Sequence, residues 1–360
     1  MLTLKKLFIL AAASLLTSAC GDGAAQETSP MSGNTSSIQG YGSNPNGTGV
    51  HVGSTQPESW FGLANVSLTW FMTGLSMRPD GSVWANGWYN VAIGVAAADA
   101  RVLSAQHDGQ NRSVVAVRTA GTRLSIDLRA ADGHIQTLTG DDILGVSLLL
   151  RVPDPTGLIY TNYRLRFRQA DALSSRFDDV DGYQMEYKVD GLLGGPWTAY
   201  CKGPGGEAQH SVFYQGAQWN PLNGARSDGD GLVAMTCESG AVATCMRWGY
   251  RPWASAPLGN GHSTGLGDYH QACVHMKRAS YCGDSKANTV DGTLIVINDP
   301  FAPAINSGPS DDLEALWTPT GATCIGSRRR PEIPFLGCPL PLPTCPENPS
   351  GGFLLSSALP

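Results

Sequence analysis

The sequence predicts a mainly β protein with a few short helices: an N-terminal antiparallel β-sandwich or barrel-like region, followed by a disulfide-rich domain. Apolar and polar residues alternate along several segments after residue 60, which is the period of half-buried strands. Glycine and proline supply 44 and 23 of the 360 residues, so turns are frequent and long helices few. Eight of the nine cysteines follow residue 200, which predicts a cross-linked second half.

Composition narrows the class of protein. Hydrophobic residues make up 42% of the chain, enough to bury a core. Charged residues make up only 15%, below the roughly 25% of ordinary soluble domains. The net charge is −6 and no basic stripe stands out, so we expect no nucleic-acid partner.

Residues 1–20 have the pattern of a lipoprotein signal peptide. Two lysines precede the apolar residues 7–16, which are too few for the roughly 20 residues of a membrane span. The small residues before Cys20 make a lipobox-like sequence, in which Cys20 is lipidated and becomes the mature N-terminus. An ordinary secretory signal cut near the same place is the alternative. Gly21 favours the outer membrane, so we expect an outer-membrane lipoprotein of the cell envelope, otherwise a secreted protein.

Residues 21–58 predict a flexible linker. They are rich in Gly, Ser, Asn and Thr and have no apolar periodicity. A coil of this length spans roughly 30 Å on average, enough to hold a folded domain away from a membrane surface.

Residues 59–182 predict the β-rich region. Leu124, Ile126 and Leu128 alternate with polar residues, as expected for a strand with one buried face. Arg164, Arg166 and Arg168 alternate with Tyr163, Leu165 and Phe167 in the same way. This arginine row could bind an anion, but we interpret it as the solvated side of a strand.

Residues 183–330 predict a disulfide-rich domain, and 331–360 a Pro-rich tail that ends loosely. An even number of cysteines in an exported chain indicates a disulfide framework. Eight cysteines allow 105 connectivities. The expected disulfide cysteines are Cys201, Cys237, Cys245, Cys273, Cys282, Cys324, Cys338 and Cys345.

Two short helices are expected in this domain. One runs over 239–248 with Ser239 at its start, and the other over 268–281 with Asp268 as its cap. Cys245 and Cys273 point inward from these helices, so we expect first a disulfide between them.

Several motifs follow one another between residues 183 and 330. They include Trp197, Trp219, Gly249-Tyr250-Arg251-Pro252-Trp253, His270-Gln271-Ala272-Cys273, Tyr281-Cys282-Gly283-Asp284, Glu314-Ala315-Leu316-Trp317 and Gly321-Ala322-Thr323-Cys324. In this order they resemble the ADYC domain, a family of exported bacterial proteins. The resemblance implies no established biochemical activity. The tetrapeptide that names the family reads Ala279-Ser280-Tyr281-Cys282 here, so its aspartate is replaced by Ser280. A hydroxyl cannot act as a general acid or base near neutral pH, which argues against catalysis at that position.

Few residues suggest catalysis or metal binding. His270 with Asp284 or Asp291 is the candidate catalytic set. His270, Cys273 and His275 have a spacing used in zinc sites, but a disulfide at Cys273 competes, and the two histidines do not share a helical face. We therefore expect no metal and no cofactor.

Trp248, Tyr250, Arg251 and Trp253 form a short aromatic and cationic block. Such a block can be a binding patch, or it can anchor the core of a disulfide-rich fold. The residues alone leave both interpretations open.

These observations favour a lipid-anchored cell-envelope protein that acts as a non-catalytic binding or structural module. Its partners would be the membrane, through the lipid, and an unidentified envelope or extracellular molecule. The alternative is a secreted hydrolase or metal-dependent enzyme that uses His270 with Asp284 or Asp291. A redox protein with one labile disulfide is a third possibility.

Overall fold

The structure is a computed structural model. It describes residues 44–45, 72–86, 89–90, 95–96, 100–153, 158–191, 194–202, 207–220, 224–258, 261–284, 286–289, 293–301, 312–332, 335 and 337–359. These residues all belong to the unit Ser37–Pro360. The expected signal peptide, Cys20 and nearly all of the expected linker lie outside the described residues.

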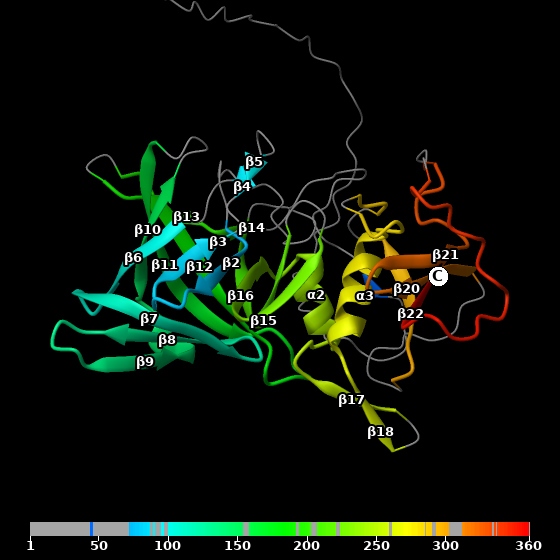
Figure 1. Cartoon of the computed structure of the whole chain (residues 1–360), viewed down its shortest axis with the longest axis horizontal. Helices are drawn as coiled ribbons and strands as arrows, with labels where there is room; N and C mark the ends of the chain where they lie inside the picture. The colour runs from blue at the N-terminus through cyan, green and yellow to red at the C-terminus, as the bar shows by residue number, and fades with distance from the viewer. Residues whose placement is uncertain are drawn as a thin grey trace, which may run out of the picture. The chain divides into compact units, whose positions relative to one another are not determined.

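Eight antiparallel strands close into a barrel, which confirms the predicted β architecture (Figure 1). Around the ring the order is β10-β11-β12-β15-β16-β2-β3-β6, and β6 pairs again with β10. The strands are β2 (Gly74–Met77), β3 (Val83–Asn86), β6 (Ala100–His107), β10 (Ser147–Pro153), β11 (Tyr160–Ala172), β12 (Asp181–Val189), β15 (Ala208–Trp219) and β16 (Arg226–Cys237).

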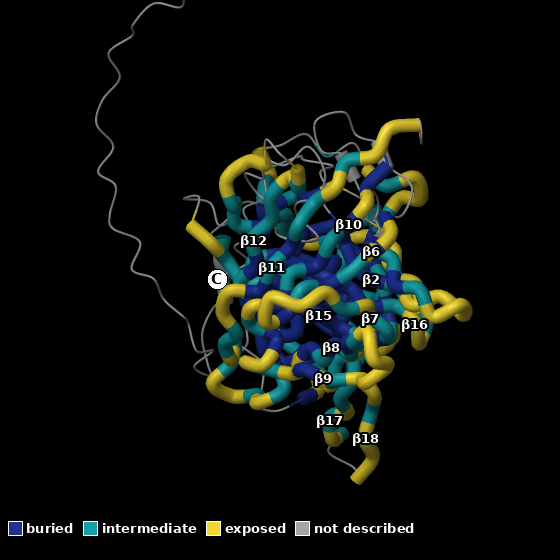
Figure 2. Tube along the Cα trace, turned by 90° about the vertical axis from the view of Figure 1, so that its left-hand side faces the viewer, coloured by how far each residue is buried: buried dark blue, intermediate teal, exposed yellow. Residues whose placement is uncertain are grey.

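The side chains of the barrel follow the period-two pattern. Leu165 and Phe167 are buried on β11, whereas the arginines between and beside them lie on the outer face. Phe167, Tyr183 and Phe213, from three adjacent strands, pack with ring centroids 5.9–6.2 Å apart. An eight-stranded barrel is just wide enough to be filled by its own side chains. Figure 2 shows the buried residues gathered where β10, β11 and β15 run, with exposed turns around them.

Three further strands continue from β6: β7 (Gln110–Ala120), β8 (Arg123–Arg129) and β9 (Ile135–Thr139), followed by the short 3₁₀ helix η1 (Gly140–Ile143). Leu124, Ile126 and Leu128 are all at most 1% exposed, as the alternation on β8 predicts. The Leu124 N–H donates to the Tyr183 hydroxyl at 2.9 Å, which ties β8 to the barrel strand β12.

The two predicted helices are present, but the first starts two residues later than expected and the second ends three residues earlier. They are α2 (Ala241–Trp248) and α3 (Gly267–Arg278), with Gly240 and Leu266 as N-caps and no side-chain capping bond at either. The expected cap residue Asp268 instead lies within the first turn of α3, where a carboxylate favours the positive end of the helix dipole. Within the described ranges, no helix is both long enough and apolar enough to cross a lipid bilayer.

A small antiparallel sheet completes the fold, with α2 and α3 between it and the barrel (Figure 1). Its order is β1-β19-β22-β20-β21, with β1 (Asn44–Pro45), β19 (Leu294–Asn298), β20 (Asp312–Thr318), β21 (Gly321–Ile325) and β22 (Leu355–Leu359). The short strands elsewhere are β4 (Tyr89–Asn90), β5 (Val95–Ala96), β13 (Thr198–Ala199), β14 (Cys201–Lys202), β17 (Ser255–Leu258) and β18 (His262–Gly265).

The prediction of a loose end over 351–360 was wrong. Strand β22 lies in the middle of the small sheet, paired with β19 and β20, and Leu355 and Ala358 are buried. A polar Pro- and Gly-rich segment precedes β22. Sequence reasoning therefore missed that the last apolar residues pack with strands that occur much earlier in the chain.

Candidate functional site

All eight C-terminal cysteines form disulfides in the structure. The pairs are Cys201–Cys237, Cys245–Cys273, Cys282–Cys338 and Cys324–Cys345. The predicted bond between α2 and α3 is therefore confirmed. Because disulfides form and persist in oxidising compartments, these bonds indicate an extracellular or cell-envelope protein.

His270, the candidate catalytic histidine, is fully buried on α3. Its Nε2 lies 3.0 Å from the carbonyl oxygen of Val242 on α2, and its ring centroid lies 5.4 Å from that of Trp219 on β15. Burial lowers the pKa of His270 to about 3, so the ring is neutral and Nε2–H donates to Val242. In this position His270 connects α2 and α3 with the end of the barrel. Its buried ring is not accessible to a substrate.

Of the two proposed partners of His270, the structure describes only Asp284, and it does not bring Asp284 to His270. Asp284 lies beyond the last residue of α3, Arg278, which is itself about 12 Å along the helix axis from His270 at 1.5 Å per residue. Its carboxylate accepts the N–H of Lys286 at 3.0 Å. Asp291 lies outside the described residues. Among the residues that the structure describes, no group of three or more His, Cys, Asp or Glu side chains could hold a metal ion.

Two members of the aromatic and cationic block belong to the core. Tyr250 is fully buried, and its hydroxyl donates to Asp299 at 2.7 Å. Trp248 is 6% exposed at the end of α2. For these two residues the packing interpretation holds, and a binding role would need them to leave the core.

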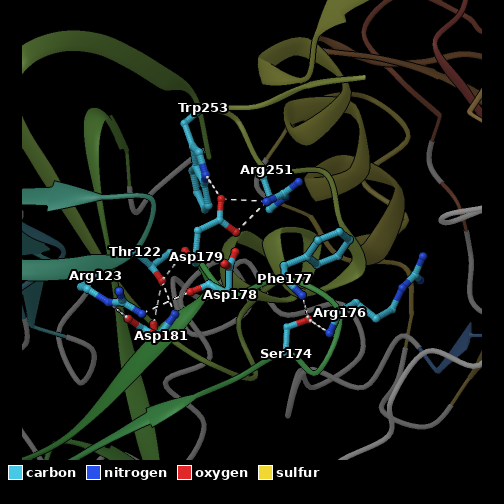
Figure 3. Close-up of polar contacts among 10 residues, drawn as sticks. All are labelled: Thr122, Arg123, Ser174, Arg176, Phe177, Asp178, Asp179, Asp181, Arg251 and Trp253. Carbon is cyan, nitrogen blue, oxygen red and sulfur yellow. Dashed lines mark hydrogen bonds and ion pairs between the residues drawn. The ribbon is translucent and has the colours of Figure 1, made fainter. Parts of the chain in front are cut away.

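The other two members of the block hold a carboxylate (Figure 3). Arg251 Nη1 lies 2.6 and 2.7 Å from the two carboxylate oxygens of Asp179, and Trp253 Nε1 donates to the same carboxylate at 2.6 Å. The Arg251 guanidinium also lies 4.2 Å from the ring centroid of Phe177. Burial opposes ionisation of Asp179, but the hydrogen bonds from Trp253 and Arg251 outweigh it and lower the pKa of that carboxyl.

The turn that carries Asp179 joins β11 to β12, and the first residue of β8 and the residue before it hold this turn from the opposite side (Figure 3). The Thr122 N–H donates to the Asp179 carbonyl at 3.0 Å, and Arg123 Nε donates to the Asp181 carboxylate at 2.7 Å. The turn is therefore a joint between the barrel and the segment after α2. Sequence reasoning gave no role to the acidic run 178–181, because the partner of Asp179 is 72 residues further along the chain.

A buried carboxylate organises the region around Tyr281. Glu314 on β20 accepts hydrogen bonds from the hydroxyls of Tyr281 at 2.8 Å and Ser357 at 2.6 Å. It also forms an ion pair with Arg329 at 2.7 Å, and neither side chain of that pair is exposed. Arg329 donates further to the carbonyl of Lys277 at the end of α3. A run of three arginines, 328–330, would be expected to be exposed, but Arg329 is buried because Glu314 and the helix carbonyls satisfy its charge inside the protein.

A family model for the ADYC domain matches residues 140–331, more than half of the chain. This chain belongs to the ADYC domain family. No curated protein and no solved structure matches it. The match begins before the motif block that carries the resemblance and includes the barrel strands β10, β11, β12, β15 and β16.

The residues at the positions of the ADYC tetrapeptide form hydrogen bonds and a disulfide within this protein. Ser280, in the place of the aspartate, is fully buried, and its hydroxyl donates to the Asp284 carbonyl at 2.6 Å. Tyr281 supplies the hydrogen bond to Glu314, and Cys282 the disulfide to Cys338. Ser280, Tyr281 and Cys282 therefore each form a bond to another part of this protein.

A second polar centre of the ADYC region was not predicted. His210 on β15 lies between two carboxylates, with Nδ1 2.6 Å from Glu238 and Nε2 2.6 Å from Asp171 on β11. Burial opposes the charged ring, but the hydrogen bonds that the ring donates to Glu238 and Asp171 outweigh this effect and raise the pKa of His210. No spacing rule could have found this centre, since the three residues come from separate segments.

Proposed function

We propose that this chain is a lipid-anchored protein of the cell envelope, in which the ADYC domain acts as a non-catalytic binding or structural module. The proposed anchor is Cys20, placed in the outer membrane by the lipobox-like sequence and Gly21. The proposed partners are the membrane and a molecule of the envelope or the cell exterior.

The main support for this proposal is that the polar residues of the ADYC region form hydrogen bonds and an ion pair with other parts of this protein. His270 binds Val242, Arg251 and Trp253 bind Asp179, and Tyr281 and Arg329 bind Glu314. A catalytic acid or base must come within hydrogen-bond reach of a substrate. These side chains instead stabilise one conformation of the protein. This supports a module that binds other molecules through its surface and in which the interior residues have a structural role.

The alternative enzyme, which uses His270 with Asp284 or Asp291, gains no support from this geometry. A general base works best when its pKa lies near the working pH, whereas burial lowers the pKa of His270 to about 3. Its Nε2 is also occupied by the Val242 carbonyl.

The test of the anchor is metabolic labelling with a fatty acid, followed by membrane fractionation, of the wild-type chain and Cys20→Ala. We expect wild-type protein to carry the label and sediment with membranes, and Cys20→Ala to lose both properties. Ser32→Ala, in the expected linker, is the matched control and should behave as wild type. Unlabelled wild-type protein, or unchanged fractionation of Cys20→Ala, would rule out the anchor.

A further inference from the structure

The outer face of the barrel carries arginines and aromatic residues in adjacent strands. Arg101 on β6 is paired with Arg151 on β10 on one side and with Trp84 on β3 on the other. The Arg151 guanidinium lies 4.2 Å from the ring centroid of Tyr160 on β11. We call Trp84, Arg101, Arg151 and Tyr160 the arginine face. Both arginines are exposed, whereas their strand neighbours Val102 and Leu150 are buried in the barrel.

Arg101 and Arg151 face each other with like charge, and like charges directly opposite on paired strands destabilise a sheet. Among the residues that the structure describes, no carboxylate lies within ion-pair distance of either. Asp80 is close enough for the charge of Arg101 to act on it, but its carboxylate accepts hydrogen bonds from the N–H and hydroxyl of Ser82.

Neighbouring arginines on β11 are arranged differently. Arg164 forms an ion pair with Asp190 at 2.6 Å, and Arg166 with Glu186 at 2.6 Å. The protein's own carboxylates thus pair with Arg164 and Arg166 on the outside of the barrel. The adjacent Arg101 and Arg151 remain available to an external anion. An anion between Arg101 and Arg151 would remove their repulsion.

An apolar edge adjoins the arginine face. Leu158, Ile159 and Tyr160 are consecutive, and they are 82%, 67% and 49% exposed. Tyr160 is paired with Pro153 at the end of β10, two residues beyond Arg151. Exposed apolar residues in a contiguous group mark interaction sites more often than single ones do.

We propose that the arginine face and the Leu158–Ile159 edge dock the barrel onto an anionic lipid surface. Arginine binds phosphate groups through paired hydrogen bonds. Tyrosine favours the headgroup level of a bilayer, and aliphatic side chains enter the boundary with the acyl chains. The aliphatic edge beside the arginines is what selects a membrane over a soluble anionic polymer. The inference rests on the proposed envelope location, but not on the lipid attached to Cys20.

The experiment measures sedimentation of the mature chain, residues 20–360 with Cys20→Ser, with lipid vesicles. The vesicles are phosphatidylcholine alone or an equal mixture with phosphatidylglycerol. We expect binding to the anionic vesicles only, weakened by added salt. The proposal would be overturned if the wild-type protein did not bind the anionic vesicles, or if it bound neutral and anionic vesicles equally. Because no acyl chain is present, this outcome is separate from the fate of the Cys20 anchor.

The variant Arg101→Gln/Arg151→Gln should bind the anionic vesicles about 30-fold more weakly, as expected for two basic residues at a charged membrane. Arg129→Gln/Lys286→Gln removes the same charge from exposed sites elsewhere and should bind as wild type. Equal weakening by both pairs would overturn the proposal, since it would show a net-charge effect.

Leu158→Ser/Ile159→Ser tests the apolar edge without changing charge. We expect it to weaken vesicle binding while leaving binding to soluble dextran sulfate unchanged. If it leaves vesicle binding unchanged, while the arginine pair weakens both kinds of binding, the face recognises soluble anionic polymers and the membrane proposal fails. Circular dichroism and the thermal midpoint confirm that each variant is folded.

Discussion

Glu314 shows how a single buried charge is accommodated in this protein. A carboxylate removed from water costs several kcal/mol unless its oxygens are hydrogen-bonded and its charge is paired. Tyr281 and Ser357 supply the hydrogen bonds, and Arg329 supplies the charge. The burial and the nearby Glu314 charge raise the pKa of Tyr281 well above its usual value, so its hydroxyl remains a donor.

Replacing Arg329 by Met should therefore lower the free energy of unfolding by about 3–5 kcal/mol, because Glu314 would be left buried without its counter-charge. Urea unfolding under oxidising conditions measures the change. The matched control is Arg328→Met, at the neighbouring and less buried arginine, for which we expect a change below about 1 kcal/mol. Similar losses in the two variants would contradict the assigned role of the ion pair.

His210 makes stability depend on pH. Its folded pKa lies above the unfolded value of 6.5, so its contribution is complete below pH 6.5 and is lost as the pH rises through the folded pKa. The groups that face it are Asp171, Glu238 and, near Glu238, Arg247.

The difference in unfolding free energy between the wild type and His210→Gln should be largest near pH 6 and shrink as the pH rises from 6.5 towards 9. Both proteins are measured by urea unfolding across this range. His134→Gln, at an exposed histidine, should show no such trend. A difference that stays constant over the range would mean that His210 is neutral in the folded protein.

At the scale of elements, the disulfides and close backbone contacts connect segments that are individually short. Gly283, with φ +65°, comes so near the Thr320 carbonyl that a Cβ atom would lie 1.9 Å from that oxygen. The Ala322 N–H donates to the Tyr281 carbonyl at 2.9 Å in the same contact. This contact explains why Tyr281-Cys282-Gly283 and Gly321-Ala322 occur together, since one motif is the packing surface of the other.

The Cys245–Cys273 disulfide joins α2, of 8 residues, to α3, of 12 residues. Helices this short are marginal alone, so we expect their stability to depend on the bond. Cys245→Ala/Cys273→Ala should lower the unfolding free energy by about 3.6 kcal/mol, as estimated for closing a loop of this size. Urea unfolding of oxidised protein measures the loss, with Cys324→Ala/Cys345→Ala as the comparison pair. A change below about 1 kcal/mol would show that packing alone holds the helices together.

At the scale of the molecule, the barrel and the disulfide-rich region share strands. The predicted boundary between residues 182 and 183 falls within β12, and the barrel continues through β16 to Cys237. The Asp179 turn and the His270 contact with Trp219 join the barrel to the helices.

A chain that starts at residue 183 should therefore fail to fold as the disulfide-rich region does in the whole protein. It would lack β2, β3, β6, β10 and β11, leaving the buried faces of β12, β15 and β16 uncovered. Near-ultraviolet circular dichroism and disulfide mapping after oxidative refolding measure this. Cooperative unfolding with the three bonds Cys245–Cys273, Cys282–Cys338 and Cys324–Cys345 intact would show instead that the region is an independent domain.

The sequence alone determined the strand faces, the number of cysteines available for pairing, the two helices and the ADYC family, because these depend on short-range periodicity and on motif order. Only the tertiary structure decided that β6 meets β10 to close the ring, that Arg329 is buried against Glu314, and that Arg101 lies opposite Arg151. Period-two alternation indicates which side of a strand is buried, but it does not specify the strand beside it. Partners separated by tens of residues are chosen by how the whole core packs.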